Sequence, residues 1–442
     1  MATTVPRIQI LSKNNYEEQY IVSLTDTIPL APLHNSAIRV SPKILSLTTN
    51  NFTYARLGHL VGWWDVHPLP PSTPAGFSDV KKYGRISAWG YGVVVESNVT
   101  GVEVGTQLYG YLPIGTLPVD LEVQLTPNIP GQILEISKQR EKLMSIYNRY
   151  MLYSPATTQE EKAKEKQSQG YDSLFQVLFE TGYLINRFVL AWEPDLLVLP
   201  SDGSEGLRRP SADVKQWTLV DAKVGDNTNV LIFSASGKTA LAFAYLLKHR
   251  RPTDKKPRAI VGIGSDSTKT FTQQTGLYDY VLAYDSDSRD LGAELALDAD
   301  SKIIIVDFGS RGGAADRWAD KLRQSYKNVA LLGVGVEVVA DSPEKTTEKI
   351  LSNLRTPNLK TQVNASEMRS QAMKIMGEKS YFKDFWEEWN LCKEGGVVKG
   401  LRLVWGQGMD DLAKAWETLY KGEFGPDEGF VFDLSAERID KI

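Results

Sequence analysis

The chain has 442 residues, 42% of them hydrophobic and 24% charged; this composition is typical of a soluble protein, and the length predicts two domains. Its formal net charge of −4 disfavours a broad surface for nucleic acid or anionic membranes, so neither is expected as a partner. The single cysteine, Cys392, excludes an internal disulfide and a cysteine-based zinc site, and the absence of a long apolar run or a signal-peptide core predicts a cytoplasmic protein.

The first 125 residues are typical of a β-rich domain. The segments IQIL, QYIVSL and AIRVSPKILSLT are rich in β-forming residues, and WGYGVVVES with VTGVEVGTQLYGYLPI predicts two strands joined near Asn98–Gly101. The proline- and glycine-rich segment at residues 68–76 predicts a surface connection.

The middle of the chain has a helical pattern. Residues 133–153 carry apolar and aromatic side chains at helical spacing, and residues 157–170 are charged enough to form a solvated loop or the start of a helix. Residues 171–192, YDSLFQVLFETGYLINRFVLAW, predict a mostly buried helix, and residues 200–216 predict a loop.

The second half alternates between apolar strands and helical stretches. Strands are predicted from Asn229 and at Arg258–Ser265, Lys302–Ser310 and Asn328–Val339. Continuously apolar strands indicate a parallel sheet that is covered on both faces and binds its ligand at the carboxyl ends of the strands. Beyond residue 341 at least two helices are predicted, followed by a strand at residues 429–434 that returns to the first domain.

The turn SASGKT after the first of these strands is a candidate phosphate site. A dinucleotide fold needs small residues here, so that the backbone and the start of the next helix can hold a diphosphate. A plain structural turn is the alternative, and a P-loop is disfavoured because Ile232 stands where its first glycine is required. The candidate cofactor residues are Ser234, Ala235, Ser236, Gly237, Lys238 and Thr239.

The end of the second strand indicates which dinucleotide is preferred. A carboxylate at this end usually holds the adenine ribose hydroxyls, but Asp266 comes just past it. Ser265 and Lys269 can bind a ribose phosphate instead, which favours NADPH over NADH. The alternative is that Ser265 and its neighbours only cap the next helix.

Several segments together resemble the medium-chain dehydrogenase/reductase superfamily, and in particular its zinc-independent quinone- and enoyl-reductase branch. Ser41–Gly58 is similar to the strand–helix segment of that family that ends in Arg-X-Gly, and Ile86–Tyr111 to its signature hairpin. Ser234–Thr239 stands in the place of its glycine-rich turn, and Ile260–Asp285 resembles its second strand, helix and third strand. The chain also resembles a divergent group defined by the DUF2855 domain.

The resemblance implies an α/β fold with two domains. A GroES-like β-rich domain would comprise residues 1–190, with insertions at about 60–85 and 125–175, and would be completed by residues from about 395 to 442. A Rossmann-type domain with a doubly wound parallel sheet would comprise residues 191–394. Strand addition between two Rossmann-type domains would give a homodimer.

The resemblance also implies catalytic residues. Tyr54, four residues before Gly58, stands where quinone reductases often carry a tyrosine, whose phenol would hydrogen-bond a carbonyl oxygen and supply its proton. Asn51 and Asn50 would orient the same oxygen. The alternative is that Tyr54 packs at the rim of its domain.

Further residues are expected near the cleft between the domains. Thr181, on the cofactor side, and Tyr183, in the substrate pocket, belong to a segment resembling the helix that the family places at the nicotinamide. Trp64 and Tyr150 lie in the two insertions and can line an apolar substrate pocket, with packing of the insertions as the alternative. The four histidines are isolated and the zinc pattern Gly-His-Glu is missing from the hairpin, so no metal is expected.

These observations predict a zinc-independent, NADPH-dependent reductase that acts on an activated C=C or C=O of a small organic molecule, such as a secondary metabolite. The weak glycine motif and the insertions leave two alternatives open. One is a non-redox lyase, cyclase or C–C hydrolase on the same scaffold. The other is an accessory, trans-acting partner of a polyketide synthase.

Overall fold

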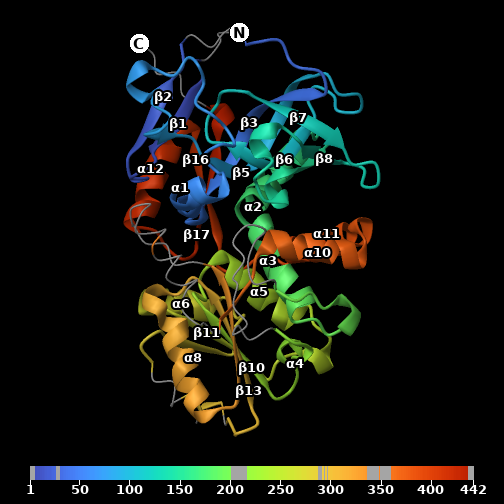
Figure 1. Ribbon diagram of the computed structural model, residues 1–442, viewed down its shortest axis with the longest axis vertical. Helices are drawn as coiled ribbons and strands as arrows, with labels where there is room; N and C mark the ends of the chain where they lie inside the picture. Colours follow the sequence, from blue (N-terminus) through green and yellow to red (C-terminus); the bar gives the residue numbers. More distant parts are fainter. Residues whose placement is uncertain are drawn as a thin grey trace.

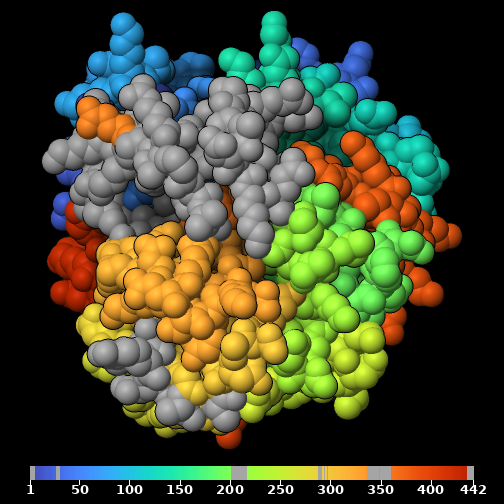
Figure 2. Space-filling model, turned by 60° about the horizontal axis from the view of Figure 1, so that its bottom comes forward, coloured from blue at the N-terminus to red at the C-terminus, as the bar shows by residue number. Residues whose placement is uncertain are grey.

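The computed structural model describes residues 5–25, 30–200, 217–286, 291–292, 294–295, 297–335, 348 and 360–436. Apart from residue 200, the loop predicted at 200–216 lies outside this set, as does the end of the strand predicted at 328–339. Figure 1 shows a β-rich half, blue to cyan, above a half built on a parallel sheet, yellow to orange. The same two halves form the upper and lower surfaces of the space-filling view in Figure 2.

A closed barrel forms the centre of the β-rich half. Its strands follow one another in the order β3–β5–β6–β9–β8–β7, and pairing of β3 with β7 closes the circle. All of these neighbours are antiparallel. The strands are β3 Ala37–Leu47, β5 Ser87–Ser97, β6 Gln107–Pro113, β7 Val119–Leu125, β8 Gln132–Glu135 and β9 Arg149–Tyr153.

The C-terminal segment returns to this barrel. The strand predicted at residues 429–434 is β17, which pairs antiparallel with β3 through Phe430↔Leu47, and β16 lies parallel beside it. Helix α12 packs against this side of the barrel and buries Trp416, whose indole donates to the carbonyl of Tyr16. The elements around the barrel are β1 Arg7–Ser12, β2 Gln19–Ser23, α1 Asn50–Val61, β4 Tyr83–Gly84, β16 Arg402–Gln407, α12 Gly408–Lys421 and β17 Glu428–Asp433.

The helical pattern at residues 133–153 is misleading, because this segment forms two strands. β8 and β9 pair with each other, with Ile133 opposite Tyr150, and β9 also pairs with β6. Short 3-10 turns at Lys138–Arg140 and Ser145–Asn148 separate the strands and bring apolar side chains to a helix-like spacing. The barrel can close only if β8 and β9 fill the gap between β6 and β7, so tertiary pairing overrides the local pattern.

The second half contains a six-stranded parallel sheet in the order β12–β11–β10–β13–β14–β15. Counted along the chain, this is the order 3-2-1-4-5-6 of dinucleotide-binding folds. The α/β fold class predicted from the sequence is therefore confirmed. The elements are α4 Leu219–Ala222, β10 Thr228–Phe233, α5 Lys238–His249, β11 Ala259–Gly264, α6 Asp266–Gln274, β12 Tyr280–Ala283, β13 Lys302–Phe308, α8 Ala314–Ser325, β14 Asn328–Gly335 and β15 Lys360–Gln362.

Both faces of this sheet are covered. Val230 and Ile232 of β10 belong to the same apolar cluster as α5, whereas Leu231 and Phe233 belong to the cluster that contains Trp318 of α8. Successive residues of a strand point to opposite faces, so a strand buried on both faces must be apolar throughout. This explains why VLIF in β10 could be recognised as a strand of a doubly wound sheet.

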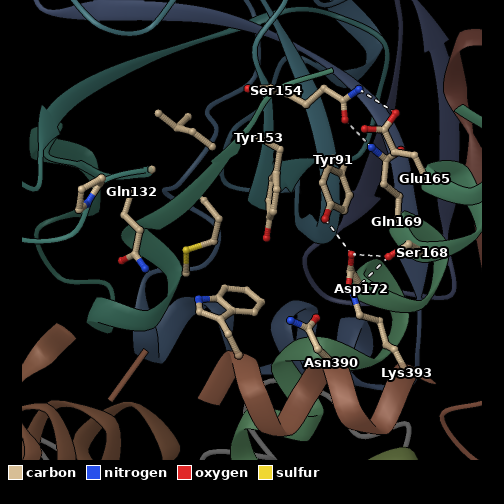
Figure 3. A pocket seen from close by; sticks show the side chains of 16 residues that line it. Tyr91, Gln132, Tyr153, Ser154, Glu165, Ser168, Gln169, Asp172, Asn390 and Lys393 are labelled. Carbon is tan, nitrogen blue, oxygen red and sulfur yellow. Dashed lines mark hydrogen bonds and ion pairs between the residues drawn. The ribbon is translucent and has the colours of Figure 1, made fainter. Parts of the chain in front are cut away.

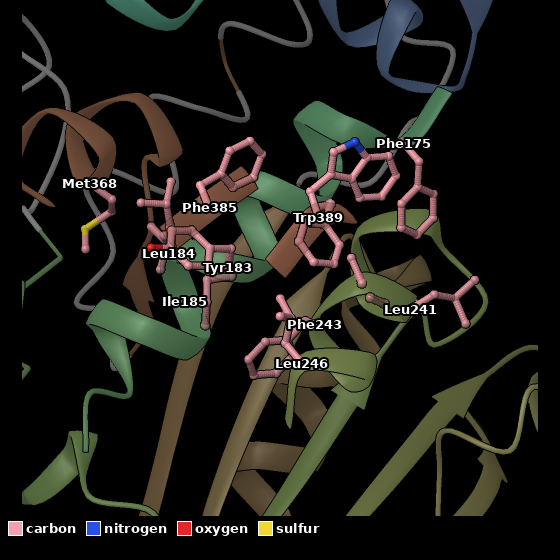
Figure 4. Packing of buried hydrophobic residues seen from close by; sticks show 14 of the residues in the cluster. Phe175, Tyr183, Leu184, Ile185, Leu241, Phe243, Leu246, Met368, Phe385 and Trp389 are labelled. Atoms are coloured by element: carbon pink, nitrogen blue, oxygen red, sulfur yellow. The ribbon is translucent and has the colours of Figure 1, made fainter. Parts of the chain in front are cut away.

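A long helical segment connects the two halves. It consists of α2 Gln159–Tyr171, a π-helical turn at Asp172–Gln176, α3 Val177–Leu184 and a second π-helical turn at Ile185–Val189. Figure 4 shows its apolar residues beside those of α5 and α11, and these helices share the largest buried cluster of the described residues. Helices α10 Ala365–Met376 and α11 Glu378–Glu394 pack against α3 from the other side.

The crossing of α3 and α5 depends on Gly182. A Cβ atom at this position would lie 2.9 Å from the backbone nitrogen of Phe243, which is closer than real Cβ contacts. Glycine inside a helix normally costs about 1 kcal/mol relative to alanine, so its presence here points to close backbone packing. The described helices include none that is both long and apolar enough to cross a membrane.

We expect Gly182→Ala to lower the free energy of unfolding by about 1–3 kcal/mol, because the added methyl group pushes α3 away from α5. Urea denaturation measures the change. Gly76→Ala is the matched control, since nothing lies within 4 Å of its Cβ position. If Gly182→Ala stabilised the protein, as helix propensity alone predicts, the close packing of the two helices would be contradicted.

Candidate cofactor and active site

The turn between β10 and α5 is held in place by two tyrosines. Ser234 adopts a left-handed backbone conformation with φ of 58°, and its hydroxyl lies 3.0 Å from the hydroxyl of Tyr284. Tyr278 donates to the carbonyl of Ala235 over 2.7 Å, and the Ala235 N–H donates to Ile263 of β11. The turn is therefore a rigid feature at the carboxyl ends of β10 and β11.

The start of α5 offers unpaired donors. The N–H of Gly237 donates to Ser234, and the first helical bond joins the N–H of Leu241 to the carbonyl of Gly237. Among the described residues, the N–H groups of Lys238, Thr239 and Ala240 have no acceptor, and the first turn carries no acidic residue. The positive end of the helix dipole and three free donors suit a phosphate.

Lys238 points elsewhere. Its ammonium nitrogen donates over 2.9 Å to the carbonyl of Glu428, at the start of β17. This bond connects the parallel-sheet half to the C-terminal part of the barrel half. Burial lowers the pKa of Lys238 to about 8, although the carboxylates of Glu428 and Asp427 act in the opposite direction. The lysine that gives SASGKT its P-loop appearance therefore acts as a contact between the two halves.

The lowered pKa of Lys238 makes stability depend on pH. Between pH 8, its pKa in the folded protein, and pH 10.5, its ordinary pKa, the unfolded chain binds the proton more strongly, so the folded state gains stability as pH rises. We expect the free energy of unfolding of the wild type to rise relative to that of Lys238→Met across this interval. Urea denaturation of both proteins at pH 7 and at the upper end of the interval measures this, and parallel pH profiles would contradict it.

The end of β11 presents a cluster of hydroxyl groups. Ser265 precedes α6, and its hydroxyl lies 3.0 Å from that of Ser267 and 3.3 Å from that of Thr268. Its side chain makes no capping bond to the backbone of α6. The half-buried Lys269 has no acceptor for its ammonium among the described residues. These donors remain available to a phosphate group.

Tyr54 lies in α1 and is almost completely buried. Its hydroxyl oxygen accepts from the side-chain amide of Asn50 over 2.6 Å and from the indole of Trp89 over 3.1 Å. Its ring packs against those of Trp63 and Tyr147. Burial raises the pKa of Tyr54 to about 12, so the phenol keeps its proton near neutral pH.

Asn51 makes no hydrogen bond to Tyr54 in this arrangement. Its side-chain oxygen accepts from the N–H of Thr48 and its amide donates to the carbonyl of Ser87. The amide of Asn51 thus joins the start of α1 to β5, while Asn50 orients the phenol.

A small cavity lies beside Tyr54. It is lined by Thr48, Asn50, Trp89 and Leu178 among others, and its volume is about 10 Å³. This is room for about one water molecule. The nicotinamide half of a dinucleotide therefore does not fit in this arrangement, whereas the turn at α5 and the hydroxyl cluster at β11 fit its phosphate half.

The other candidate residues lie away from this cavity. The hydroxyl of Thr181 donates to the carbonyl of Val177 within α3. Tyr150 donates to the carbonyl of Tyr111, and Tyr183 donates to the carboxylate of Asp384 over 2.6 Å. Trp64 is buried against Gly58 and Gly84 in the barrel half. None of these four side chains lines the cavity beside Tyr54.

Sequence reasoning missed the role of Trp89. Trp89 was not among the predicted site residues, yet its indole donates to the hydroxyl of Tyr54 and its ring stacks with that of Tyr109. The available signal was the alternation of aromatic residues in β5 and β6, where Trp89, Tyr91, Tyr109 and Tyr111 share one face. The described residues contain no group of three or more histidine, cysteine or acidic side chains that could hold a metal.

The fold and site can now be compared with known proteins. The family "Protein of unknown function (DUF2855)" matches residues 45–425. The chain belongs to this family. No curated protein matches the sequence. Because the match spans most of both halves, this DUF2855 protein contains the barrel, the linking helix and the parallel sheet within one family unit.

Several solved structures share the fold. CurK enoyl reductase has a TM-score of 0.50 at 11% identity, covering 97% of this chain and 99% of the other. A putative NADPH:quinone reductase from Bacillus thuringiensis has a TM-score of 0.52 at 10% identity, covering 98% and 99%. A mutant enoyl thioester reductase from Candida tropicalis has a TM-score of 0.51 at 11% identity, covering 98% and 100%. At such identities the likeness shows the fold alone, which this chain shares with these enoyl and quinone reductases.

Proposed function

We propose that this DUF2855 protein is a zinc-independent reductase that uses NADPH to reduce an activated C=C or C=O of a small organic molecule. The observation that carries the proposal is the set of free N–H groups at the start of α5, next to the strand order of a dinucleotide-binding sheet. The reductases named above share this fold, and one of them is described as NADPH-dependent. A redox role is therefore the function that agrees best with both observations.

In this proposal each residue has a distinct task. The amides of Lys238, Thr239 and Ala240 hold the diphosphate, assisted by the hydroxyls of Ser234 and Ser236, and Ser265 and Lys269 hold the ribose phosphate. NADPH, when bound, supplies the hydride. Thr181 is the residue expected at the nicotinamide end of the cofactor.

On the substrate side, Tyr54 holds the proton on its phenol. Asn50 and Trp89 donate to the phenol oxygen and so hold it in place. Asn51 fixes the start of α1 against β5, and with it the position of Tyr54.

Thermal unfolding with NADPH, NADH and no ligand tests the proposal. NADPH at about 100 times its Kd should stabilise the protein by about 2.7 kcal/mol, and NADH should do so less at the same concentration. Absence of stabilisation by either nucleotide at millimolar concentration would end the redox proposal.

A second candidate is a non-redox enzyme on the same scaffold, such as a lyase or hydrolase. The cavity of about 10 Å³ beside Tyr54 favours it, because this space is too small to hold a nicotinamide ring. This candidate predicts turnover in the complete absence of nicotinamide nucleotides. Turnover that requires NADPH would exclude it.

The organisation of the chain follows the same proposal. We infer a barrel domain of residues 1–190 completed by about 395–442, a Rossmann-type domain of residues 191–394, a homodimer and a cytoplasmic location. The pairing of β17 with β3 supports the inference that the C-terminal segment completes the barrel domain. Analytical ultracentrifugation measures the oligomeric state.

A further inference from the structure

A second and larger cavity lies on the other side of the linking helix. Its volume is about 460 Å³, within the range of small-molecule sites. The barrel strands β6, β8 and β9 form one wall, and helices α2 and α11 form the opposite wall (Figure 3). Segments from both halves of the molecule thus enclose one space.

Asp172 lies at the back of this cavity, at the beginning of a π-helical turn. Its carboxylate accepts from the hydroxyl of Tyr91 over 2.8 Å and from the ammonium of Lys393 over 2.9 Å (Figure 3). It also accepts from the indole of Trp389 over 2.8 Å. The ion pair neutralises both charges. The lysine is therefore not a free cation that could hold an anionic ligand.

The remaining polar groups of the cavity are mostly uncharged. The side-chain oxygen of Gln132 accepts from Arg149, which leaves its NH₂ group to donate toward the space. The amide of Asn390, on α11, is exposed and has no partner among the described residues. Glu165 accepts from Gln107 through one carboxylate oxygen, and its second oxygen remains an acceptor.

These groups select the charge of a ligand. Glu165 is half-buried and negative, so an anion would be repelled. The amides of Gln132 and Asn390 offer both donors and acceptors, a combination that suits hydroxyl groups. The half-buried ring of Trp386 adds an aromatic surface to the same wall as Asn390.

We propose that this cavity binds a neutral, polyhydroxylated small molecule, such as a monosaccharide or a disaccharide. Trp386 packs against the C–H face of the ligand, while Gln132, Asn390 and Glu165 exchange hydrogen bonds with its hydroxyl groups. The mixture of aromatic rings with amides and a carboxylate matches a ligand that has both apolar faces and many hydroxyls.

This site is separate from the proposed cofactor site. Asp172 lines the large cavity, whereas its neighbours Ser173 and Leu174 line the small cavity beside Tyr54. The π-helical turn therefore separates the large cavity from the small cavity beside Tyr54. Such turns are frequent at functional sites. The inference goes beyond the reductase proposal and does not depend on NADPH binding.

Isothermal titration calorimetry with the full chain tests the inference. The probes are glucose, maltose and myo-inositol as neutral polyols, glucose 6-phosphate as an anion and choline as a cation. We expect at least one neutral probe to bind, with neither charged probe binding more tightly. Tighter binding of a charged probe would overturn the inference, and so would failure of all three neutral probes at millimolar concentration.

Variants locate the binding. Asn390→Ala, at an exposed position, and Trp386→Leu should each weaken the neutral probe by about tenfold, because one loses hydrogen bonds and the other an aromatic surface. Glu387→Gln, an exposed position on the same helix outside the cavity lining, is the matched control and should leave the affinity unchanged. Equal affinities in all three variants would overturn the inference, whereas NADPH affinity should be the same in each.

Discussion

Replacing Asp172 by alanine is expected to lower the free energy of unfolding by about 3–5 kcal/mol. The carboxylate is only 5% exposed and accepts from side chains on two elements, Tyr91 of β5 and Trp389 and Lys393 of α11. Its removal leaves a partly buried ammonium without its counter-charge and two buried donors without an acceptor. The loss also separates the barrel from α11.

Urea denaturation at neutral pH measures this effect. Asp254→Ala is the matched control, because its ion pair with Lys255 lies at the surface and such pairs contribute about 0–1 kcal/mol. The double variant Asp172→Ala with Lys393→Met should be more stable than Asp172→Ala alone, since it no longer contains the uncompensated ammonium. A loss below that of the surface control would show that Asp172 does not hold the halves together.

The strands of the parallel sheet could be predicted because burial on both faces requires a run of consecutive apolar residues, which is visible in the sequence. β10 and β13 contain the continuous apolar runs VLIF and IIIV, and each strand is followed by a helix that covers the sheet. The final strand β17 was recognisable for the same reason, as a short β-forming run after α12. Local sequence carries this information because each strand meets an apolar environment along its whole length.

The barrel was harder to predict because its closure depends on pairing between distant segments. β8 and β9 are short, and their apolar residues fall at helical spacing only because two tight turns separate them. Nothing local distinguishes them from a helix. The pairing of β9 with β6 and of β7 with β3 decides the outcome, and both contacts join segments far apart in the chain.

The candidate site was only partly accessible for a related reason. Tyr54 and Asn51 could be picked out, but the partners of Tyr54 include Trp89, which is 35 residues away and is oriented by the pairing of β5 with β3. The sequence made Lys238 a candidate phosphate ligand, but in the structure its ammonium donates to the carbonyl of Glu428 at the start of β17. The cavity at Asp172 is lined by residues that lie between Tyr91 and Lys393 in the sequence. No single segment of the sequence therefore predicts it.

Introducing a carboxylate at the turn before α5 is expected to abolish most of the affinity for NADPH. Ser236 is half-buried and lies two residues before the helix whose first amides are free. In Ser236→Asp the negative charge occupies the place of the diphosphate and repels it, and each 1.4 kcal/mol of repulsion is a tenfold loss. We expect the Kd for NADPH to rise by about 10- to 100-fold.

The same substitution should leave the fold intact, which makes the result interpretable. A carboxylate near the start of a helix interacts favourably with its dipole and contributes about 0.3–1 kcal/mol to stability. Asn364→Asp is the matched control: it adds the same charge at the start of α10, where the side-chain oxygen of Asn364 already accepts from Ser366 and Glu367.

Fluorescence titration with NADPH measures both Kd values, and thermal unfolding without ligand measures both stabilities. Asn364→Asp should bind NADPH as the wild type does, which separates a local effect at the turn from a general effect of net charge. If the wild type binds NADPH and Ser236→Asp has the same Kd, the diphosphate does not bind at the start of α5. Failure of the wild type itself to bind would instead remove the reductase proposal and leave the non-redox enzyme.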